Sequence, residues 1–263
     1  MKDMKVIILC GGQGTRLREE TEFKPKPMVP VGGVPILWHI MKIYSHYGVR
    51  NFVLCLGYRG DMIKQYFLNQ ELMSRDFTIS LKAGKKIVHD GVEGIEDWNI
   101  TLADTGLNSM TGARVKKIER YVDGDEFLLT YGDGLADADI NAVIAHHRKA
   151  GTVGTLTGVN PQSRFGMVKT DDKGIVTEFV EKPILFNDYV NGGFYVFKKD
   201  FFDYLEGDDT CVLETKPLSI LAKKRQLSMY KHSGFFHCMD TYKDSLDLNR
   251  IWDSGKAPWK VWK

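Results

Sequence analysis

Short apolar runs alternate with stretches of helical spacing through the first part of the chain. The runs predict strands over residues 5–10, 51–56, 78–82, 126–131 and 152–159. The stretches between them predict helices over residues 35–47, 61–68 and 139–149. In the first of these helices Leu37, Ile40, Met41 and Tyr44 fall on one face. This alternation is typical of an α/β protein with a Rossmann-like, mostly parallel central sheet and helices on both faces.

From residue 152 onward the pattern changes to paired strands joined by turns. Strands over residues 164–170 and 175–181 flank a turn at 171–174, and a further strand covers 189–197, which together predict a smaller antiparallel sheet element. The last third predicts a helix over 213–224, a strand over 227–231 and a helix over 242–252. Because no repeat or flexible linker interrupts the sequence, we expect a single domain over residues 1–263. The tail carries Trp259 and Trp262, and we expect it to pack on its own subunit or on a neighbour.

Composition and charge narrow the class of protein. The 36 lysines and arginines nearly balance the 34 aspartates and glutamates, so the net charge of +2 (36 − 34) argues against a nucleic-acid partner. The apolar run at residues 6–10 is far shorter than the roughly 20 residues that cross a bilayer, and no signal-peptide pattern precedes it, so we expect no membrane association. The four cysteines contain no CxxC pair, which favours free thiols and a cytoplasmic location: Cys10, Cys55, Cys211 and Cys238.

A glycine-rich loop follows the first predicted strand. Three glycines within the segment Gly11-Gly12-Gln13-Gly14-Thr15-Arg16 let backbone N–H groups surround an anion, because no Cβ stands in the way. The dinucleotide fingerprint is not met, since Leu17 stands where its third glycine belongs, and the Gly-Lys-Ser/Thr ending of a P-loop is absent. A tight structural turn is the alternative interpretation of the glycines.

A lysine between two prolines follows this loop. Pro25 and Pro27 restrict the backbone around Lys26, so we expect an extended arm that delivers the ammonium group at one angle toward the bound anion. Arg16 adds a second cation within the same segment. Together the loop and the arm predict a phosphate-binding site.

Two aspartates follow apolar runs and are candidates for metal ligands. Asp133 ends the strand over 126–131 between two glycines, at the sheet edge where open α/β sheets bind ligands. Asp240 ends the apolar run at 236–239, and Mg²⁺ is commonly held by one or two carboxylates together with phosphate oxygens. The alternative for Asp240 is an N-cap of the helix that follows it, and Asp137 is also well placed as an N-cap.

Several motifs together resemble those of the sugar-1-phosphate nucleotidylyltransferases. The resemblance rests on GGQGTRLREETEFKPKPMVPVGGVPIL at the start and continues through WNITLADTG, SMTGARVKK, TYGDG, EKP, NGGFYVF, MDT and GKAPWK, over nearly the whole chain. It implies an enzyme with a bound Mg²⁺ on Asp133 and Asp240, and it implies catalytic roles for Arg16, Lys26 and Asp133. Members of this family tend to form homo-oligomers, and the same is expected here.

The resemblance also implies two groups of binding residues. Residues 1–150 mainly bind the nucleotide, and residues 151–263 mainly bind the sugar phosphate, supply Asp240 and hold the assembly elements. The nucleotide-binding residues implied are Leu9, Cys10, Gly11, Gly12, Gln13, Gly14, Thr15, Arg16, Lys26, Ser109, Thr111, Arg114 and Gly132. The sugar-phosphate-binding residues implied are Glu181, Lys182, Asn191 and Gly192. Ser109 or Thr111 is alternatively the cap of a helix, and Glu181 and Lys182 a surface ion pair.

Within that family, the middle and C-terminal motifs most resemble the members that transfer a cytidylyl group from CTP to glucose 1-phosphate. The products would be CDP-glucose and pyrophosphate. The residue types around Ser109 and Thr111 permit cytosine, but UTP or dTTP remains an alternative. A non-catalytic nucleotide-sugar sensor and a Rossmann oxidoreductase are further alternatives. The metal acids and Lys26 favour an enzyme over the sensor, and the missing third glycine disfavours the oxidoreductase.

Overall fold

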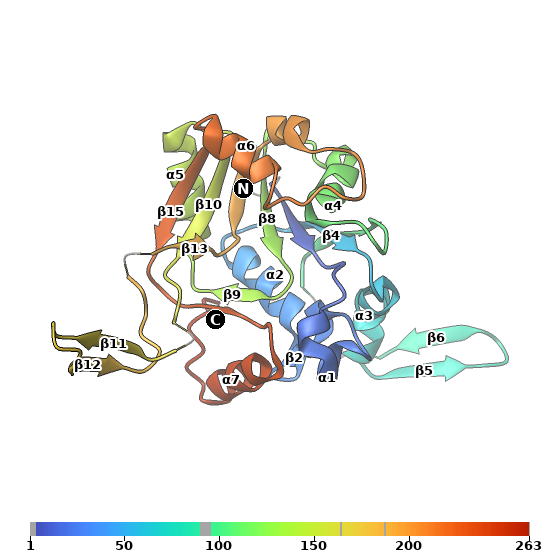
Figure 1. Ribbon diagram of the computed structural model, residues 1–263. Helices are drawn as coiled ribbons and strands as arrows, with labels where there is room; N and C mark the ends of the chain where they lie inside the picture. The colour runs from blue at the N-terminus through green and yellow to red at the C-terminus, as the bar shows by residue number, and fades with distance from the viewer. Residues whose placement is uncertain (1–3, 90–95, 164, 187, 263) are drawn as a thin grey trace.

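A mixed central sheet forms the middle of the molecule in the computed structural model, which describes residues 4–89, 96–163, 165–186 and 188–262. Over these residues eight strands follow the order β13-β10-β14-β8-β1-β4-β7, with β15 paired to β10 (Figure 1). The strands are β1 (Lys5–Leu9), β4 (Asn51–Leu56), β7 (Asn99–Asp104), β8 (Glu126–Tyr131), β10 (Gly154–Val159), β13 (Val190–Asn191), β14 (Tyr195–Lys198) and β15 (Leu227–His232).

Most neighbouring strands of this sheet run parallel. β1 is parallel to β4 and β8, β4 to β7, and β10 to β15. β14 runs antiparallel to both β8 and β10, and β13 runs antiparallel to β10. The expectation of a mostly parallel sheet is therefore confirmed. The carboxyl ends of β1, β4, β7 and β8 lie at one edge, where loops can meet.

Helices cover both faces of the sheet, also as expected. They are α1 (Arg18–Thr21), α2 (Ile36–His46), α3 (Gly60–Met73), α4 (Thr111–Lys117), α5 (Ile140–Ala150), α6 (Pro217–Lys223) and α7 (Tyr242–Asp253). Val6 and Ile8 of β1 belong to the core packed against α2 and α5, whereas Ile7 and Leu9 belong to the core packed against α4 and α6. Alternate side chains of one strand thus anchor two helical layers, because successive side chains in a strand point to opposite faces.

Four small antiparallel pairs accompany the main sheet. They are β2 (Pro30–Val31) with β3 (Val34–Pro35), β5 (Phe77–Ser80) with β6 (Lys85–Val88), β9 (Gly134–Ala136) with β16 (Phe236–Cys238), and β11 (Met167–Thr170) with β12 (Val176–Val180). The β5–β6 and β11–β12 hairpins project from opposite ends of the molecule (Figure 1). The predicted antiparallel element is thus present as the β11–β12 hairpin; Arg164, which begins the predicted strand, lies outside the described residues.

The strand predicted over 78–82 is present as β5, but its expected place in the central sheet is wrong. That segment forms β5 in the exposed hairpin, and the sheet edge is instead occupied by β7, whose polar Asn99, Thr101 and Asp104 weaken its apolar signal. A strand of alternating polarity on a partly exposed edge is harder to find than a buried one, because only part of its surface is covered.

Other element boundaries also differ from those predicted. The helix over 213–224 begins only at Pro217, since proline is tolerated in the first turn of a helix and not in its interior. The strand over 189–197 is split into β13 and β14 at Gly192 and Gly193, where Gly193 has a φ of +77°. The expected extended arm is instead folded, as α1 and as a 3-10 helix at Lys26–Met28 with Pro27 in its first turn.

The predicted helix caps also change. α7 is capped by Thr241, whose hydroxyl accepts from the N–H of Asp244, so Asp240 is left free of a capping role. α5 is capped by Asp139 and not by Asp137. α4 has Met110 at its N-cap without a side-chain hydrogen bond, so neither Ser109 nor Thr111 caps it.

The C-terminal tail packs on its own subunit. Trp259 is fully buried, and its indole N–H donates to Nδ1 of His39 over 3.4 Å. Nε2 of His39 donates in turn to the carbonyl oxygen of Val31 over 2.8 Å. Burial lowers the pKa of His39 to about 4, so the imidazole is neutral in this cluster. Among the helices described, none has the length and apolar character needed to cross a membrane.

Candidate active site

The end of β1 and the end of β8 form the floor of a cavity. Leu9 pairs with Tyr131 in the sheet, and the N–H of Gly132 donates to the carbonyl oxygen of Leu9 over 3.1 Å. The cavity has a volume of about 380 Å³ and is here called the nucleotide-side cavity. It is lined by Leu9, Cys10, Gly11, Gly12, Gly14, Thr15, Arg16, Lys26, Pro27, Ser109, Met110, Thr111, Arg114, Tyr131, Gly132 and Asp133.

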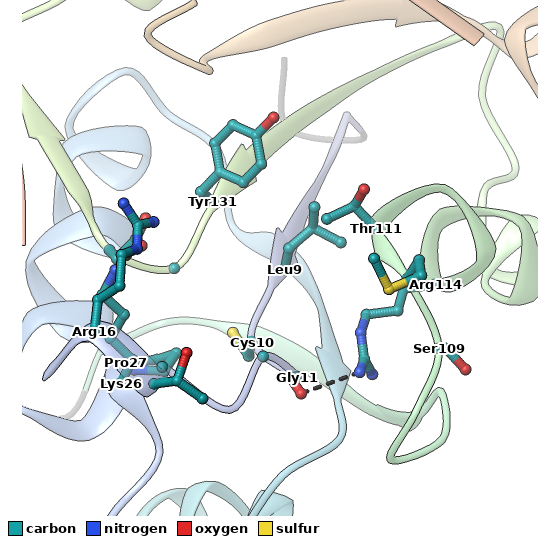
Figure 2. A pocket seen from close by; sticks show the side chains of 16 residues that line it. Leu9, Cys10, Gly11, Arg16, Lys26, Pro27, Ser109, Thr111, Arg114 and Tyr131 are labelled. Carbon is teal, nitrogen blue, oxygen red and sulfur yellow. Dashed lines mark hydrogen bonds and ion pairs between the residues drawn. The ribbon is translucent and has the colours of Figure 1, made fainter. Parts of the chain in front are cut away.

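The structure therefore brings together the residues that the sequence assigned to the nucleotide, with one exception. Gln13 does not line the nucleotide-side cavity and borders a neighbouring hollow with Thr15 and Tyr58. Arg16 and Lys26 lie on one side of the end of β1, and Ser109, Thr111 and Arg114 lie on the other (Figure 2). The two cations and the residues at the start of α4 thus line the same cavity from opposite sides.

Close packing against the Arg114 side chain and against the backbone of Leu9 explains why glycine occupies two positions on this floor. A Cβ on Gly11 would lie 2.2 Å from Nη1 of Arg114, and one on Gly132 would lie 2.8 Å from the carbonyl oxygen of Leu9. Gly14 has a φ of +63°, the left-handed region that favours glycine. The structural role of the glycines and the anion-binding role proposed for the loop are therefore compatible.

The guanidinium group of Arg114 makes its hydrogen bonds to other parts of the protein. Its side chain is 4% exposed, and its guanidinium donates to the carbonyl oxygens of Gly11, Leu56, Gly106 and Leu107 and to the hydroxyl of Thr105. The bond to Gly11 is drawn in Figure 2 and measures 3.0 Å. Arg114 thus ties the ends of β1, β4 and β7 together beneath the cavity.

A cluster of two cations and two carboxylates lies at the mouth of the cavity. Nζ of Lys26 lies 2.5 Å from Oδ2 of Asp133 and 2.7 Å from Oδ1 of Asp240, and Nη1 of Arg16 lies 2.9 Å from Oδ2 of Asp240. Burial lowers the pKa of Lys26, but the carboxylates of Asp133 and Asp240 outweigh it and the net shift is upward. The ammonium group is therefore charged at neutral pH.

The two aspartates come from distant segments that a small sheet brings together. Asp133 lies in the two-residue turn between β8 and β9, and Asp240 follows β16, the partner of β9. The N–H of Met239 donates to the carbonyl oxygen of Asp133 over 2.9 Å, which fixes the register of the two turns. The predicted pair of metal carboxylates is thus brought to one place.

These aspartates fit a divalent metal of the hard type. Ligand atoms of Asp133, Cys238 and Asp240 lie within 4.8 Å of one another. Burial, and next the charge of Asp133, raise the pKa of the Cys238 thiol, which stays neutral and is a poor ligand for a hard cation. The carboxylates are therefore the fitting donors, and oxygen donors suit Mg²⁺.

A second cavity of about 310 Å³ adjoins the same cluster and is here called the sugar-side cavity. It shares Arg16, Tyr131 and Asp133 with the nucleotide-side cavity. Its other lining residues are Thr130, Gly134, Asn191, Gly192, Phe236, Cys238 and Asp240. Asn191 and Gly192, which the sequence assigned to the sugar, therefore line the same cavity as Asp133 and Asp240.

Glu181 and Lys182 lie elsewhere. They follow the exposed hairpin strand β12 and line neither of these two cavities. Nζ of Lys182 is 3.6 Å from Oε1 of Glu181, and both side chains are about half exposed, at 46% and 62%. In this structure they form the surface ion pair that the sequence left as their alternative interpretation.

Some residues of the site were missed from the sequence. Tyr131 lies on the wall shared by both cavities, and its hydroxyl donates to Glu214 over 2.5 Å. Pro27 and Met110 also line the nucleotide-side cavity. Tyr131 stands directly before Gly132 in the TYGDG motif, so the motif could have indicated its place in the site. No motif surrounds Glu214 in the sequence.

With this geometry in view, comparison with known proteins decides the family. The family model described as nucleotidyl transferase matches residues 5–239. The chain belongs to the nucleotidyl transferase family. It is therefore an enzyme of the nucleotidyltransferase class, and the cavities, cations and carboxylates described above lie where its strands end.

Individual members of the nucleotidyl transferase family differ in how similar they are to this chain. The chain is 47% identical over 261 residues to glucose-1-phosphate cytidylyltransferase of Salmonella typhi, covering 99% of this chain and 100% of the relative. It is 29% identical over 211 residues to UTP–glucose-1-phosphate uridylyltransferase of a Synechocystis strain, covering 77% of this chain and 51% of that protein. The solved structure of HddC from Yersinia pseudotuberculosis with GMP-PN has a TM-score of 0.66 at 21% identity, covering 95% and 99%, which supports the fold alone.

Proposed function

We propose that this nucleotidyltransferase transfers a cytidylyl group from CTP to α-D-glucose 1-phosphate and releases CDP-glucose and pyrophosphate. The observation that carries the reaction type is the meeting of the two cavities at Lys26, Arg16, Asp133 and Asp240. The full-length 47% identity to a cytidylyltransferase, against partial 29% identity to a uridylyltransferase, favours CTP and glucose 1-phosphate as substrates.

The proposed reaction needs no protein nucleophile. A phosphate oxygen of glucose 1-phosphate attacks the α-phosphorus of CTP, and the bond to the β-phosphate oxygen breaks as pyrophosphate departs. The sugar phosphate is already ionised, so the protein has to bring two polyanions together and to neutralise charge on the leaving group. The shared wall of the two cavities suits the first task, and the cations suit the second.

Arg16 and Lys26 are proposed to act on the triphosphate. The Arg16 side chain is 68% exposed and is held by one ion pair to Asp240, so it can turn toward phosphate oxygens. Lys26 is 11% exposed and lies at the boundary of the cavities, where charge develops on the departing pyrophosphate. A charged donor placed there contributes most in the transition state.

The divalent metal is proposed to be Mg²⁺, held by Asp133 and Asp240. When bound, it would neutralise phosphate charge and draw electrons from the reacting phosphorus. Lys26 pairs with both of these carboxylates and Arg16 pairs with that of Asp240, so the two cations hold the carboxylates close together.

Arg114 is proposed to affect the nucleotide through the loop. Because its donors contact Gly11 and the neighbouring strand ends, it fixes the loop's shape and leaves the backbone N–H groups to the ligand. Glu181 and Lys182 would contact the sugar phosphate only after their segment moves toward the sugar-side cavity. The proposed division therefore keeps residues 1–150 for the nucleotide, and Asn191, Gly192 and Asp240 from 151–263 for the sugar and the metal.

Two further features support a homo-oligomer in the cytoplasm. The β11–β12 hairpin exposes Val168, Val176 and Phe179 at 50%, 57% and 63%, and an isolated two-stranded hairpin is marginally stable in water. A second copy of the chain could cover this surface. The cysteines of the described residues are all free thiols, which suits a reducing compartment.

A pyrophosphate-release assay over a panel of nucleoside triphosphates and sugar 1-phosphates tests the proposed function. We expect turnover with CTP and glucose 1-phosphate to exceed that of every other pair. Faster turnover with UTP or dTTP would overturn the cytidylyl assignment, and no pyrophosphate with any pair would favour a non-catalytic binding protein.

A further inference from the structure

A chain of four polar side chains connects the two cavities. Glu214 accepts a hydrogen bond from the hydroxyl of Tyr131 over 2.5 Å, and the hydroxyls of Tyr131 and Tyr195 lie 2.8 Å apart. Nδ2 of Asn191 donates to the hydroxyl oxygen of Tyr195 and, over 3.4 Å, to that of Tyr131. Glu214, Tyr131, Tyr195 and Asn191 are here called the polarity relay.

The chemistry of its first member determines the direction of every bond in the relay. A carboxylate has no proton to give, so Tyr131 must donate its single O–H to Glu214. The oxygen of Tyr131 can then only accept, so the O–H of Tyr195 must point toward it. The oxygen of Tyr195 is in turn left to accept, and only the NH₂ side of the Asn191 amide can supply that proton.

This direction and the backbone N–H of Gly193 agree on which side of the Asn191 amide faces away from the tyrosines. Its oxygen Oδ1 accepts from the N–H of Gly193 over 3.0 Å and has a second lone pair. Asn191 lines the sugar-side cavity, so that lone pair can accept from a hydroxyl of the sugar.

We infer that Glu214 is a positioning residue that sets the direction of the polarity relay and so presents the Asn191 carbonyl oxygen to a hydroxyl group of the sugar. The inference rests on the proposed function, because it takes the sugar-side cavity to hold glucose 1-phosphate. Glu214 itself lines neither of the two cavities and acts through Tyr131.

The second carboxylate oxygen of Glu214 has a partner outside the polarity relay, and that partner provides a control for the test. It accepts from the hydroxyl of Thr111 over 2.7 Å, on the wall of the nucleotide-side cavity. The hydroxyls of Thr111 and Tyr131 are both visible in Figure 2. Thr111 is not part of the polarity relay, so removing its hydroxyl disturbs the same carboxylate without changing the direction in which Tyr131 donates.

The test compares glucose 1-phosphate with its monofluoro analogues, in which fluorine replaces one sugar hydroxyl at a time. Fluorine can accept weakly but cannot donate, so it fails at a position that donates to Oδ1 of Asn191. With CTP as the nucleotide, we expect the wild-type protein to lose about tenfold in kcat/KM for fluorine at one position. In Glu214→Met, Tyr131 loses its acceptor and its O–H can turn toward Tyr195, so the NH₂ side of Asn191 loses its ordered acceptors. The amide is then held mainly by the N–H of Gly193, and most of that discrimination should disappear.

Tyr195→Phe is the second variant, since it interrupts the relay at a different residue and should give the same loss of discrimination. Thr111→Val should keep the wild-type discrimination against fluorine. Thermal unfolding of each variant shows which of them are folded, and Tyr195→Phe decides the question if Glu214→Met does not fold. A purely structural role for Glu214 would lower stability without altering the ratio between hydroxyl and fluorine substrates.

Two results would overturn the inference. One is unchanged discrimination in folded Glu214→Met or Tyr195→Phe, and the other is a wild-type protein that turns over the parent sugar but is insensitive to fluorine at every position. Absence of pyrophosphate release from CTP and the parent sugar itself is a different outcome, because it counts against the proposed function on which the inference rests.

Discussion

The ammonium group of Lys26 lies 2.5 Å from Oδ2 of Asp133, although 107 residues separate the two in the sequence. Its charge is compensated by the same carboxylates that are proposed to hold the metal. This arrangement keeps a buried lysine charged and aimed at the boundary between the two cavities, so each residue in the cluster can be tested by what it does to turnover.

Lys26→Ala is expected to lower kcat/KM by about 100-fold or more, because a cation near the departing pyrophosphate acts most strongly in the transition state. Steady-state pyrophosphate release measures this. Lys24→Ala is the matched control, since Lys24 lies two residues away and pairs with Glu20 over 3.0 Å outside both cavities. A small rise in KM with unchanged kcat would make Lys26 a simple binding residue.

Asp133→Asn is expected to abolish Mg²⁺-dependent turnover while the protein stays folded, because the carboxylate supplies charge at the surface of the cavity and little to the core. Titration of activity against Mg²⁺, together with circular dichroism, measures both properties. Asp123→Asn serves as the control, as Asp123 pairs with Lys5 far from the cluster. Near-normal turnover of Asp133→Asn at the wild-type Mg²⁺ concentration contradicts a ligand role.

Local signals in the sequence explain what could be predicted. The glycine loop and Asp133 come just after a strand, and Lys26 lies between two prolines, so adjacent residues fix their positions. Glu214 could not be found in this way, because its partners Thr111 and Tyr131 lie 103 and 83 residues away and its own surroundings carry no motif. Helix caps failed for a different reason: Asp137 and Asp139 are equally good caps by type, and only the start of α5 decides between them.

The contacts of Arg114 could not be predicted from the sequence either. A charged residue beside a nucleotide motif suggests ligand contact, whereas the structure satisfies its donors with backbone carbonyl oxygens from three strand ends. Burial of an arginine cannot be read from a single sequence, because the acceptors come from distant segments. The residue therefore belongs to the site through the loop that it holds.

Arg114→Ala is expected to destabilise the protein by roughly 3 kcal/mol, because carbonyl oxygens of Gly11, Leu56 and Gly106 lose a charged donor in a buried place. It should also raise the KM for the nucleotide more than the KM for the sugar phosphate. Urea unfolding and steady-state kinetics measure the two effects. Equal effects on both KM values would contradict a role confined to the glycine loop.

Because His39 is buried in its neutral form, the stability of the protein should fall as the pH is lowered from about 6.5 to 4. Its folded-state pKa of about 4 lies below its ordinary value of 6.5, so the unfolded chain binds the proton more readily across this window. The contribution of neutral, buried His39 to the free energy of unfolding is complete above pH 6.5 and amounts to roughly 3 kcal/mol at most. Urea unfolding at several pH values should show a shallower slope for His39→Gln than for the exposed control His89→Gln. Equal slopes would contradict this account.

The last prediction concerns the base, where CTP should be used at least about tenfold better than UTP or dTTP. Cytosine carries an amino donor where uracil and thymine carry a carbonyl acceptor, so the protein must offer an acceptor. The hydroxyl of Thr111 fits this need. It donates its proton to Glu214 and accepts from the N–H of Leu213 over 2.9 Å, so one lone pair remains as an acceptor toward a ligand. Thr111→Val should therefore reduce the preference for CTP over UTP, measured as a ratio of kcat/KM values. Thr215→Val is the control, since Thr215 is exposed and its hydroxyl donates to the carbonyl oxygen of Val212. An unchanged ratio in Thr111→Val would place the discrimination on the backbone of residues 9–12 instead.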